Sequence, residues 1–347
     1  MSVLEVRDLQ AEFRVRSGTV HAVNGVSFSL EAGRTLALVG ESGSGKSATA
    51  LSLMRLNPEP PCVYTGGTVE FEGRDILTQN ERQLRSVRGK GLAMVFQDPM
   101  TSLNPVRTVG AQIAQALHRH ENLSRSEAKQ RAVQALRDVR IPDPEGRAAQ
   151  YPHQLSGGMR QRVMIAIALA CRPKVLIADE PTTALDVTVQ AQIMELLEDL
   201  RTRFEMAVLL ITHDLGMVAE TADEVAVMYA GRIVERARAA DLFARPMMPY
   251  TAALLESVPR VDRPRGEIAD PIPGAPPNLS LPLAGCAFAP RCRVATVRCR
   301  TTVPPLELKA DGHRAACVLS PEDVRAAFTT TGRRGRSVAL AEERTAP

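Results

Sequence analysis

Hydrophobic and polar residues follow two different patterns in the regions of this chain that we expect to form strands. Residues 4–30 roughly alternate between apolar and polar side chains, which predicts strands with one covered face. By contrast, TLALVG at 35–40, VLIADE at 175–180 and AVLLITHD at 207–214 are almost continuously apolar. Such short runs predict strands covered on both faces, as in a parallel sheet.

Helical spacing dominates residues from about 98 to 170, where Ser124 or Ser126 is a plausible N-terminal cap. A further helix is predicted over 187–204, between two of the buried strands, and a strand pair over 224–235. This order of strand, helix and strand predicts an α/β fold with a mainly parallel sheet and helices on its faces.

Composition changes after Ser257, where proline becomes frequent and helical periodicity ends. We therefore predict a main domain over 1–257, with a helical subdomain at about 98–167. A small, irregular, cysteine-rich domain is expected over 258–328. The tail, 329–347, has little to bury and is expected to be flexible.

Overall composition restricts the class of protein only mildly. The 347 residues are 44% apolar and 24% charged, and a net charge of +4 allows contact with nucleotides or a membrane without requiring either. No apolar run in the sequence approaches the roughly 18–20 residues that cross a bilayer. The N-terminus has no basic start followed by an apolar core, so we expect a cytosolic protein whose membrane role depends on partners.

A glycine-rich loop follows the predicted strand at 35–40 and precedes a helix. Its sequence, GESGSGKS at 40–47, fits the phosphate-binding pattern G-x-x-x-x-G-K-[ST]. Glycines let backbone N–H groups surround phosphates, Lys46 supplies a charge for the β- and γ-phosphates, and Ser47 can ligate Mg²⁺. The residues predicted to bind ATP here are Gly40, Ser42, Gly43, Gly45, Lys46 and Ser47.

Three further strand ends carry polar residues suited to hydrolysis. Asp179 is placed to hold Mg²⁺, and Glu180 to polarise the attacking water. His213 follows the next buried strand and can contact the γ-phosphate. Gln97 also ends a strand, where it can reach Mg²⁺ or the water. Each of these could be structural if taken alone, but the phosphate loop requires such a carboxylate.

A second glycine-rich turn, LSGGM at 155–159, opens another helix. With the phosphate loop, the acidic strand end and His213 in this order, the sequence resembles the ATP-binding-cassette (ABC) ATPases over about residues 3–257. LSGGM is similar to their LSGGQ signature, with Met159 in place of glutamine. The resemblance implies a mixed sheet core, an antiparallel β subdomain and a helical subdomain. It also implies nucleotide-binding roles for Phe13, Ser156, Gly157, Gly158 and Asp186.

The same resemblance implies that two ATPase domains pair head to tail. Ser156–Gly158 of one would close on the γ-phosphate held by Lys46 of the other, excluding water from the site. This chain carries one set of motifs, so we expect a second ATPase subunit, forming a heterodimer. Soluble relatives that act on ribosomes carry two sets, and those that act on DNA carry long coiled coils, so we expect no nucleic-acid partner.

Segments such as MPYTAALLESVPR narrow the resemblance to the ATPases of oligopeptide and dipeptide importers, of the first of their two ATPase types. That implies two membrane-spanning permease subunits, an extracytoplasmic substrate-binding protein and a peripheral position on the cytoplasmic face of the membrane. Peptide is the expected substrate class. Nickel or another small solute, or a soluble ABC ATPase without transport, remain alternatives.

Four cysteines lie close together near the C-terminus, with the spacing C-x5-C-x6-C-x17-C. Clustered cysteines in a reducing cytosol are metal ligands more often than disulfides. The tail resembles the cysteine motif of the same importer ATPases, which implies a [4Fe–4S] cluster on Cys286, Cys292, Cys299 and Cys317. Zinc and no metal remain alternatives. Four nearby arginines (Arg291, Arg293, Arg298 and Arg300) could offset the thiolate charge or form a solvated basic face.

Overall fold

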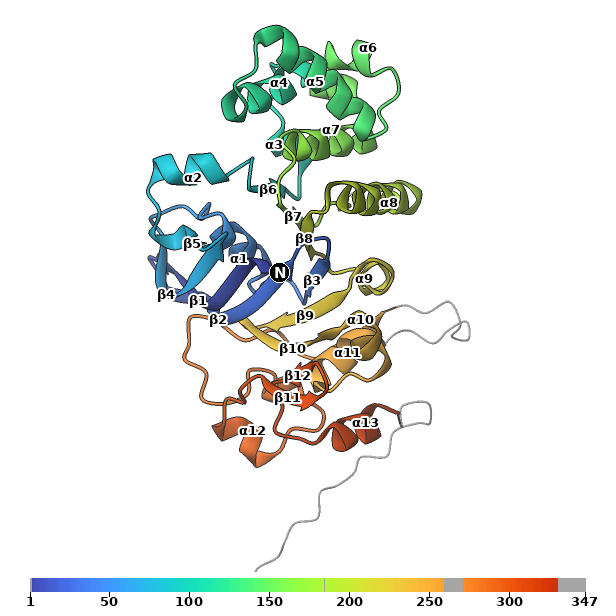
Figure 1. Cartoon of the computed structure of the whole chain (residues 1–347). Coiled ribbons are helices and arrows are strands. Elements are labelled where there is room, and N and C mark those ends of the chain that lie inside the picture. The colour runs from blue at the N-terminus through green and yellow to red at the C-terminus, as the bar shows by residue number, and fades with distance from the viewer. Residues whose placement is uncertain (1, 184, 259–270, 330–347) are drawn as a thin grey trace, which may run out of the picture.

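The computed structural model describes residues 2–183, 185–258 and 271–329, and in these it contains two sheets (Figure 1). The larger has the strand order β11-β12-β10-β9-β3-β8-β7-β6. Its strands are β3 (Thr35–Val39), β6 (Leu92–Val95), β7 (Val175–Asp179), β8 (Ala207–Ile211), β9 (Glu224–Tyr229), β10 (Arg232–Arg238), β11 (Glu307–Ala310) and β12 (His313–Ala315). Pairing from β9 to β6 is parallel, and β10, β12 and β11 add antiparallel strands. The sheet is therefore mixed, as expected.

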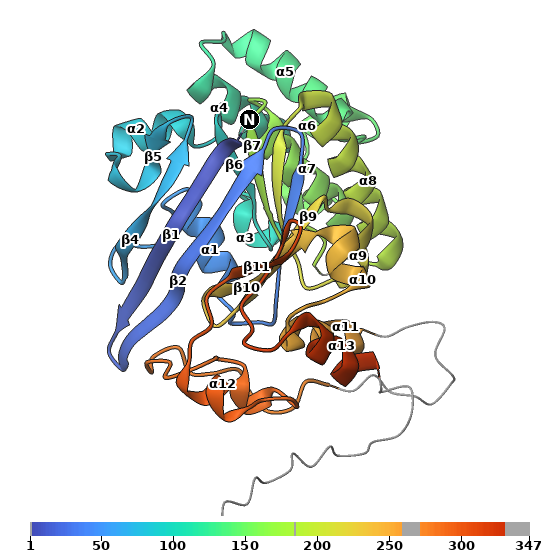
Figure 2. The ribbon, with the colours of Figure 1, turned by 60° about the horizontal axis from the view of Figure 1, so that its bottom comes forward.

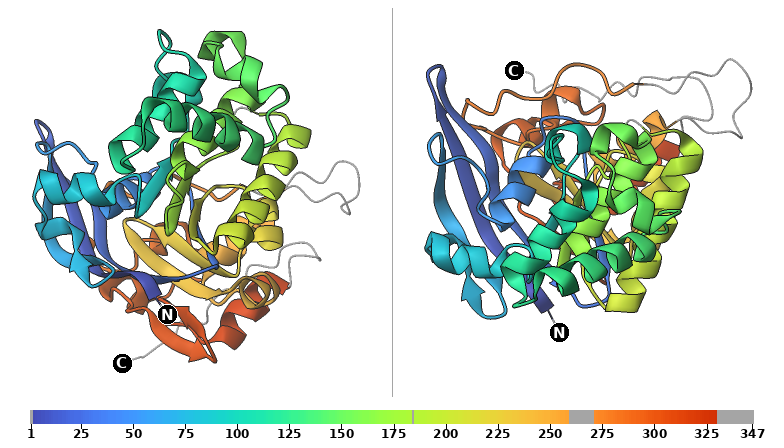
Figure 3. Two further views of the ribbon diagram at one scale, coloured as in Figure 1. Left: turned by 45° about the horizontal axis from the view of Figure 1, so that its top comes forward. Right: turned by 90° about the horizontal axis from the view of Figure 1, so that it is seen from above.

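Each central strand is buried on both faces because alternate residues enter different core clusters. Leu209 and Ile211 of β8 pack towards the four-stranded sheet, whereas Val208 and Leu210 pack towards the helices. Figure 3 shows the helical part in green and the four-stranded sheet in blue on different sides of the main sheet. The continuous apolar runs thus correctly predicted strands with two covered faces.

The second sheet is antiparallel and has the order β2-β1-β4-β5. Its strands are β1 (Ser2–Val15), β2 (Gly18–Glu31), β4 (Cys62–Phe71) and β5 (Arg74–Asp75), with α1 (Lys46–Leu53) and α2 (Glu81–Val87) nearby. Alternating residues such as Leu4 and Val6 are buried against the main sheet, as the sequence pattern predicted.

A helical region fills the chain between β6 and β8, interrupted by β7. Its helices are α3 (Pro99–Ser102), α4 (Val109–His120), α5 (Arg125–Asp138), α6 (Pro144–Ala148), α7 (Gly157–Leu169) and α8 (Val187–Phe204). Val109, Ile113 and Leu117 place one buried stripe of α4 in the core. Ser124, not Ser126, caps α5, and it forms a capping box with Glu127.

The chain after β8 includes α9 (Leu215–Thr221), α10 (Ala239–Ala244), α11 (Pro249–Ser257), α12 (Val297–Thr301) and α13 (Pro321–Thr329). The cysteine-rich part extends the main sheet, because β12 pairs with β10 at Glu235 and Arg236. Figure 2 shows α13 beside α11. The sequence pattern did not predict this hairpin or α13. The predicted tail lies outside the described residues except for Thr329, and no helix among those described is long and apolar enough to span a membrane.

Candidate nucleotide site

The glycines of the phosphate loop are required by the backbone that surrounds them. Gly40 has φ 152°, and a Cβ there would lie 2.2 Å from the carbonyl oxygen of Met228. Gly45 has φ 105°, and its Cβ would lie 2.2 Å from the carbonyl oxygen of Ala22. Both contacts are impossible for any other residue without movement of the backbone. The loop between β3 and α1 is therefore wedged between β2 and β9.

Lys46 lies inside this loop, at the first position of α1. Its ammonium donates to the carbonyl oxygens of Gly40 at 2.8 Å and Glu41 at 3.0 Å. Burial lowers the pKa of Lys46, and the opposing negative charges of Glu180, Asp179 and Glu41 raise it. The loop thus holds a buried cation among carboxylates, while the neighbouring Ser42, Gly43 and Ser47 are exposed.

Asp179 ends β7 and is buried. Burial raises the pKa of its carboxyl, against the lowering effect of a hydrogen bond with Ser47. Its Oδ1 atom is buried and has no hydrogen-bond partner among the described residues. An orphaned carboxylate oxygen beside a serine hydroxyl fits the ligand chemistry of Mg²⁺, which takes oxygen ligands and binds through one or two carboxylates together with phosphates.

Glu180 is the point where the predicted hydrolytic residues meet. Gln97 donates from Nε2 to Glu180 Oε2 at 2.8 Å, Thr183 donates to the same oxygen at 2.8 Å, and His213 Nδ1 lies 3.2 Å from Oε1. Burial raises the pKa of Glu180, but the hydrogen bonds from Thr183 and His213, together with the charges of His213 and Lys46, leave the pKa below its ordinary value. The carboxylate is thus ionised and fixed in position.

The backbone at Glu180 supports the same arrangement. Glu180 has φ 47°, a left-handed conformation that is uncommon outside glycine, and its N–H donates to the carbonyl oxygen of Ile211 at 2.8 Å. This turn follows β7 and leads to Thr183, whose hydroxyl contacts the Glu180 carboxylate. Thr183 was not among the predicted site residues; its position three residues after Glu180 was the only sequence signal.

The signature turn lies apart from the phosphate loop. Ser156 is exposed and caps α7, accepting a hydrogen bond from the N–H of Met159 at 3.4 Å. Asp186 likewise caps α8, accepting from Val189 at 3.0 Å. Figures 1 and 2 place α7 and α1 in different parts of the molecule. Within one chain, the structure therefore leaves these two predicted anion sites separate.

Phe13 lies on β1, where it pairs with Val20 of β2 and Cys62 of β4. Its ring is half-buried and packs against the cluster between the two sheets. The Phe13 ring therefore lies at the edge of a packed core. The stacking of adenine on this ring stays a prediction.

The four clustered cysteines converge on one small cavity, which is otherwise lined mainly by apolar residues such as Met248 and Phe288. Burial raises the pKa of Cys292 and Cys317 to about 11. Among the described residues, no group of three or more His, Cys, Asp or Glu is arranged to hold a metal ion. Four thiols are the donor type that thiolate-ligated metals take, and binding would have to displace their protons.

The arginines near these cysteines do not form one group. Arg291 is buried and pairs with Glu41 of the phosphate loop, and Arg293 pairs with Glu256 at 2.6 Å. Arg298 and Arg300 are exposed. Arg291, buried against Glu41, therefore fits neither of the two alternatives, whereas Arg293 is exposed and pairs with a carboxylate.

The sequence of this chain matches two families and many known proteins. Residues 23–183 match the family described as ABC transporter, and residues 234–299 match the C-terminal region of oligopeptide/dipeptide transporters. A probable peptide ABC transporter ATP-binding protein of Sinorhizobium fredii is 56% identical, over 93% of this chain and 96% of that protein. The oligopeptide transport ATP-binding protein OppD of Bacillus subtilis is 51% identical, over 90% and 87%.

The fold is similar to that of a solved dimeric ATP-binding cassette in a post-hydrolysis state, bound to ADP and phosphate. The TM-score is 0.61 at 26% identity, covering 68% of this chain and 98% of that one.

Proposed function

This chain belongs to the ATP-binding proteins of oligopeptide and dipeptide ABC transporters, and on that premise we propose that it hydrolyses ATP where Lys46, Asp179 and Glu180 meet. As such a subunit it is an ATPase that powers the import of peptides across the membrane. The observation that carries the assignment of the site is the Glu180 carboxylate, which is held by side chains from three separate segments of the chain.

Each residue has a defined task in this proposal. Lys46 exchanges the carbonyls of Gly40 and Glu41 for the β- and γ-phosphates of ATP. Glu180 accepts a proton from the attacking water, and Gln97 and His213 orient that carboxylate. Ser47 and Asp179 would hold Mg²⁺, which when bound neutralises charge on the phosphates.

The signature turn supplies the second half of the site in a head-to-tail pair of ATPase subunits. Ser156, Gly157 and Gly158 present an exposed helix start to the γ-phosphate bound by a partner. Asp186 is exposed and caps α8, whose neighbouring residues Leu185 and Val189 lie against Gly157 and Gly158. We propose a heterodimer, with a second ATPase of related sequence as the partner.

The membrane subunits are proposed to contact the segment that follows Gln97. Met100 and Val106 there are 59% and 79% exposed, although both are apolar. A cavity of about 680 Å³, lined by α4, α5 and α6, begins at Arg107, the residue after Val106. Permease contact at this place would move Gln97, and through it Glu180. We therefore propose a peripheral position at the cytoplasmic face, with two permeases and an extracytoplasmic binding protein.

A [4Fe–4S] cluster on Cys286, Cys292, Cys299 and Cys317 is the proposed group of the cysteine cavity, with Zn²⁺ as the alternative. Its support is the convergence of four thiols on one mainly apolar cavity. When bound, it would cross-link the cysteine-rich segment. Anaerobically purified protein is expected to contain iron and sulfide and to absorb visible light. A Cys317→Ser variant is expected to lose the iron, the sulfide and the absorbance. Zinc without iron would contradict the cluster.

Replacing Glu180 with glutamine tests the hydrolytic site. We expect ATP turnover by the assembled transporter to fall by about 10²–10⁴-fold, because the general base is lost. ATP binding should persist, because the phosphate loop is untouched. Glu195→Gln is the matched control, since Glu195 pairs with Arg140 on the exposed face of α8. Full turnover by the Glu180 variant would refute the assignment.

A further inference from the structure

The cysteine-rich segment reaches into the phosphate loop through one buried side chain. The Arg291 side chain is 5% exposed, and its two terminal nitrogens donate to Glu41 Oε2 at 2.5 Å and Oε1 at 2.8 Å. Its remaining donors bond the backbone oxygen of Pro273 at 2.8 Å and the Tyr229 hydroxyl at 3.2 Å. A bidentate guanidinium–carboxylate pair of this kind is geometrically specific.

Glu41 connects this pair directly to the residue that binds phosphate. Its carbonyl oxygen accepts a hydrogen bond from Lys46, and its N–H donates to the Tyr250 hydroxyl at 2.8 Å. The negative charge of Glu41 also acts on Lys46, where it favours the charged ammonium. The same carboxylate would repel a triphosphate bound at Lys46, because both groups are negatively charged.

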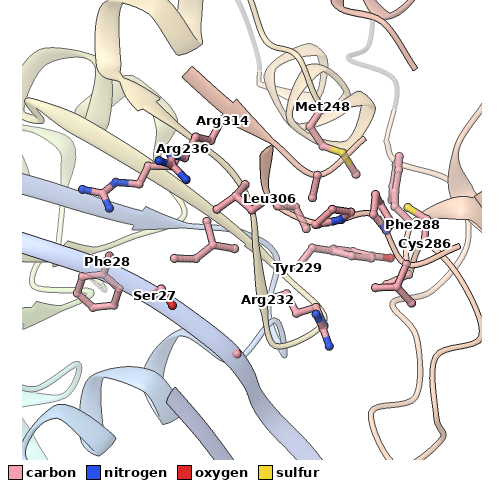
Figure 4. Close-up of a pocket in the computed structure, with 18 of the residues that line it drawn as sticks. Ser27, Phe28, Tyr229, Arg232, Arg236, Met248, Cys286, Phe288, Leu306 and Arg314 are labelled. Atoms are coloured by element: carbon pink, nitrogen blue, oxygen red, sulfur yellow. The ribbon is translucent and has the colours of Figure 1, made fainter. Parts of the chain in front are cut away.

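Aromatic packing gives the segment a second route to the loop. Tyr229 of β9 and Tyr250 of α11 have ring centroids 4.4 Å apart, and Phe288 lies 5.5 Å and 5.2 Å from them. Figure 4 shows Tyr229 extending towards Phe288 and Cys286 at one end of a cavity of about 510 Å³. Phe288 directly precedes the helical turn that ends in Arg291. The ring cluster thus fixes the guanidinium and the Tyr250 hydroxyl relative to each other.

We infer that Arg291 is a positioning residue for nucleotide binding. By pairing with Glu41 it holds that carboxylate and cancels a negative charge beside the phosphates that Lys46 binds. The cysteine-rich segment therefore sets the nucleotide affinity of the ATPase site. This inference rests on the nucleotide site proposed above, and it assigns that site a residue about 250 positions away in the chain.

The test compares MgADP binding by full-length variants in titration calorimetry. Arg291→Met leaves Glu41 unpaired, and we expect MgADP to bind at least tenfold more weakly. Adding Glu41→Gln removes the uncompensated charge, so the double variant should recover to within about threefold of the parent chain. Arg293→Met is the matched control, because it breaks the Arg293–Glu256 pair of the same segment without touching the loop; its affinity should be unchanged.

The double variant also covers the case in which Arg291→Met fails to fold, since it buries no unpaired carboxylate. The inference is overturned if Arg291→Met binds MgADP within twofold of the parent, or if the double variant binds tenfold or more weakly than the parent. Lys46→Ala separates the two proposals. If it loses binding while Arg291→Met does not, only this inference fails; if it binds normally, the proposed nucleotide site fails.

Discussion

The two glycine-rich turns of this chain differ in what makes their glycines necessary. At Gly40 and Gly45 a side chain would collide with backbone of the same molecule. At Gly157 a Cβ would meet only Leu185, at an ordinary 3.6 Å, and at Gly158 it would meet the end of the Val189 side chain. Contacts within the chain therefore explain why the phosphate loop needs glycine at these two positions. Gly157 lies on open surface, so the reason for its glycine must lie in a contact with another molecule. A nucleotide carried by a second subunit provides one.

The most severe test of this contrast is to add one methyl group to each turn. Gly40→Ala should lose MgADP binding by 100-fold or more, with about 1–3 kcal/mol of stability lost to backbone strain alone. Gly157→Ala should bind MgADP normally and change the free energy of unfolding by no more than about 0.5 kcal/mol. Calorimetric binding and denaturant unfolding measure both. Equal damage from the two changes would remove the contrast.

A larger group at Gly157 sharpens the same point in the assembled transporter. Gly157→Val should lower ATP turnover by about tenfold or more, because the added atoms stand where the partner's γ-phosphate must approach. Nucleotide binding by the isolated chain should stay intact. Val187→Ala, at an 81% exposed position near the same turn, is a control of similar exposure. Normal turnover in the Gly157 variant would show that this surface does not meet nucleotide.

A smaller effect is expected within the pre-formed half of the site. The pKa of Glu180 lies below its ordinary value, so activity should be full above that pKa and fall as the pH drops through it. Thr183→Val removes a hydrogen bond to the carboxylate, so the pKa rises and the acid limb of the turnover profile moves to higher pH. Turnover near neutral pH should change little. A limb that stays in place would exclude Thr183 from this role.

Local sequence patterns predicted the strands, helices and loops that depend on interactions between residues close together in the chain. The strand before Gly40, the helix after it and the acidic end of β7 follow from short apolar runs and one glycine-rich motif. Gln97, Glu180 and His213, each placed at a strand end by the sequence, meet because neighbouring parallel strands end at the same edge of the sheet.

Contacts between distant segments were beyond the reach of those patterns. Nothing near Arg291 in the sequence indicates Glu41 as its partner, and an arginine beside cysteines suggests thiolate compensation instead. The β11–β12 hairpin was missed for a related reason. Its strands are short and mostly exposed, and they join the sheet only through the pairing of β12 with β10. The buried His313–Glu235 contact of 2.7 Å arises from that pairing.

The pairing of β12 with β10 also changes which strand forms one edge of the main sheet. Backbone N–H and C=O groups along Val234–Arg236 are covered by the added hairpin, as in the bond from Ala316 to Val234. Without that hairpin, β10 would become an open sheet edge next to apolar side chains, a template for aggregation. The cysteine-rich segment therefore covers β10 and leaves the short, mostly exposed β11 as the edge strand of the main sheet.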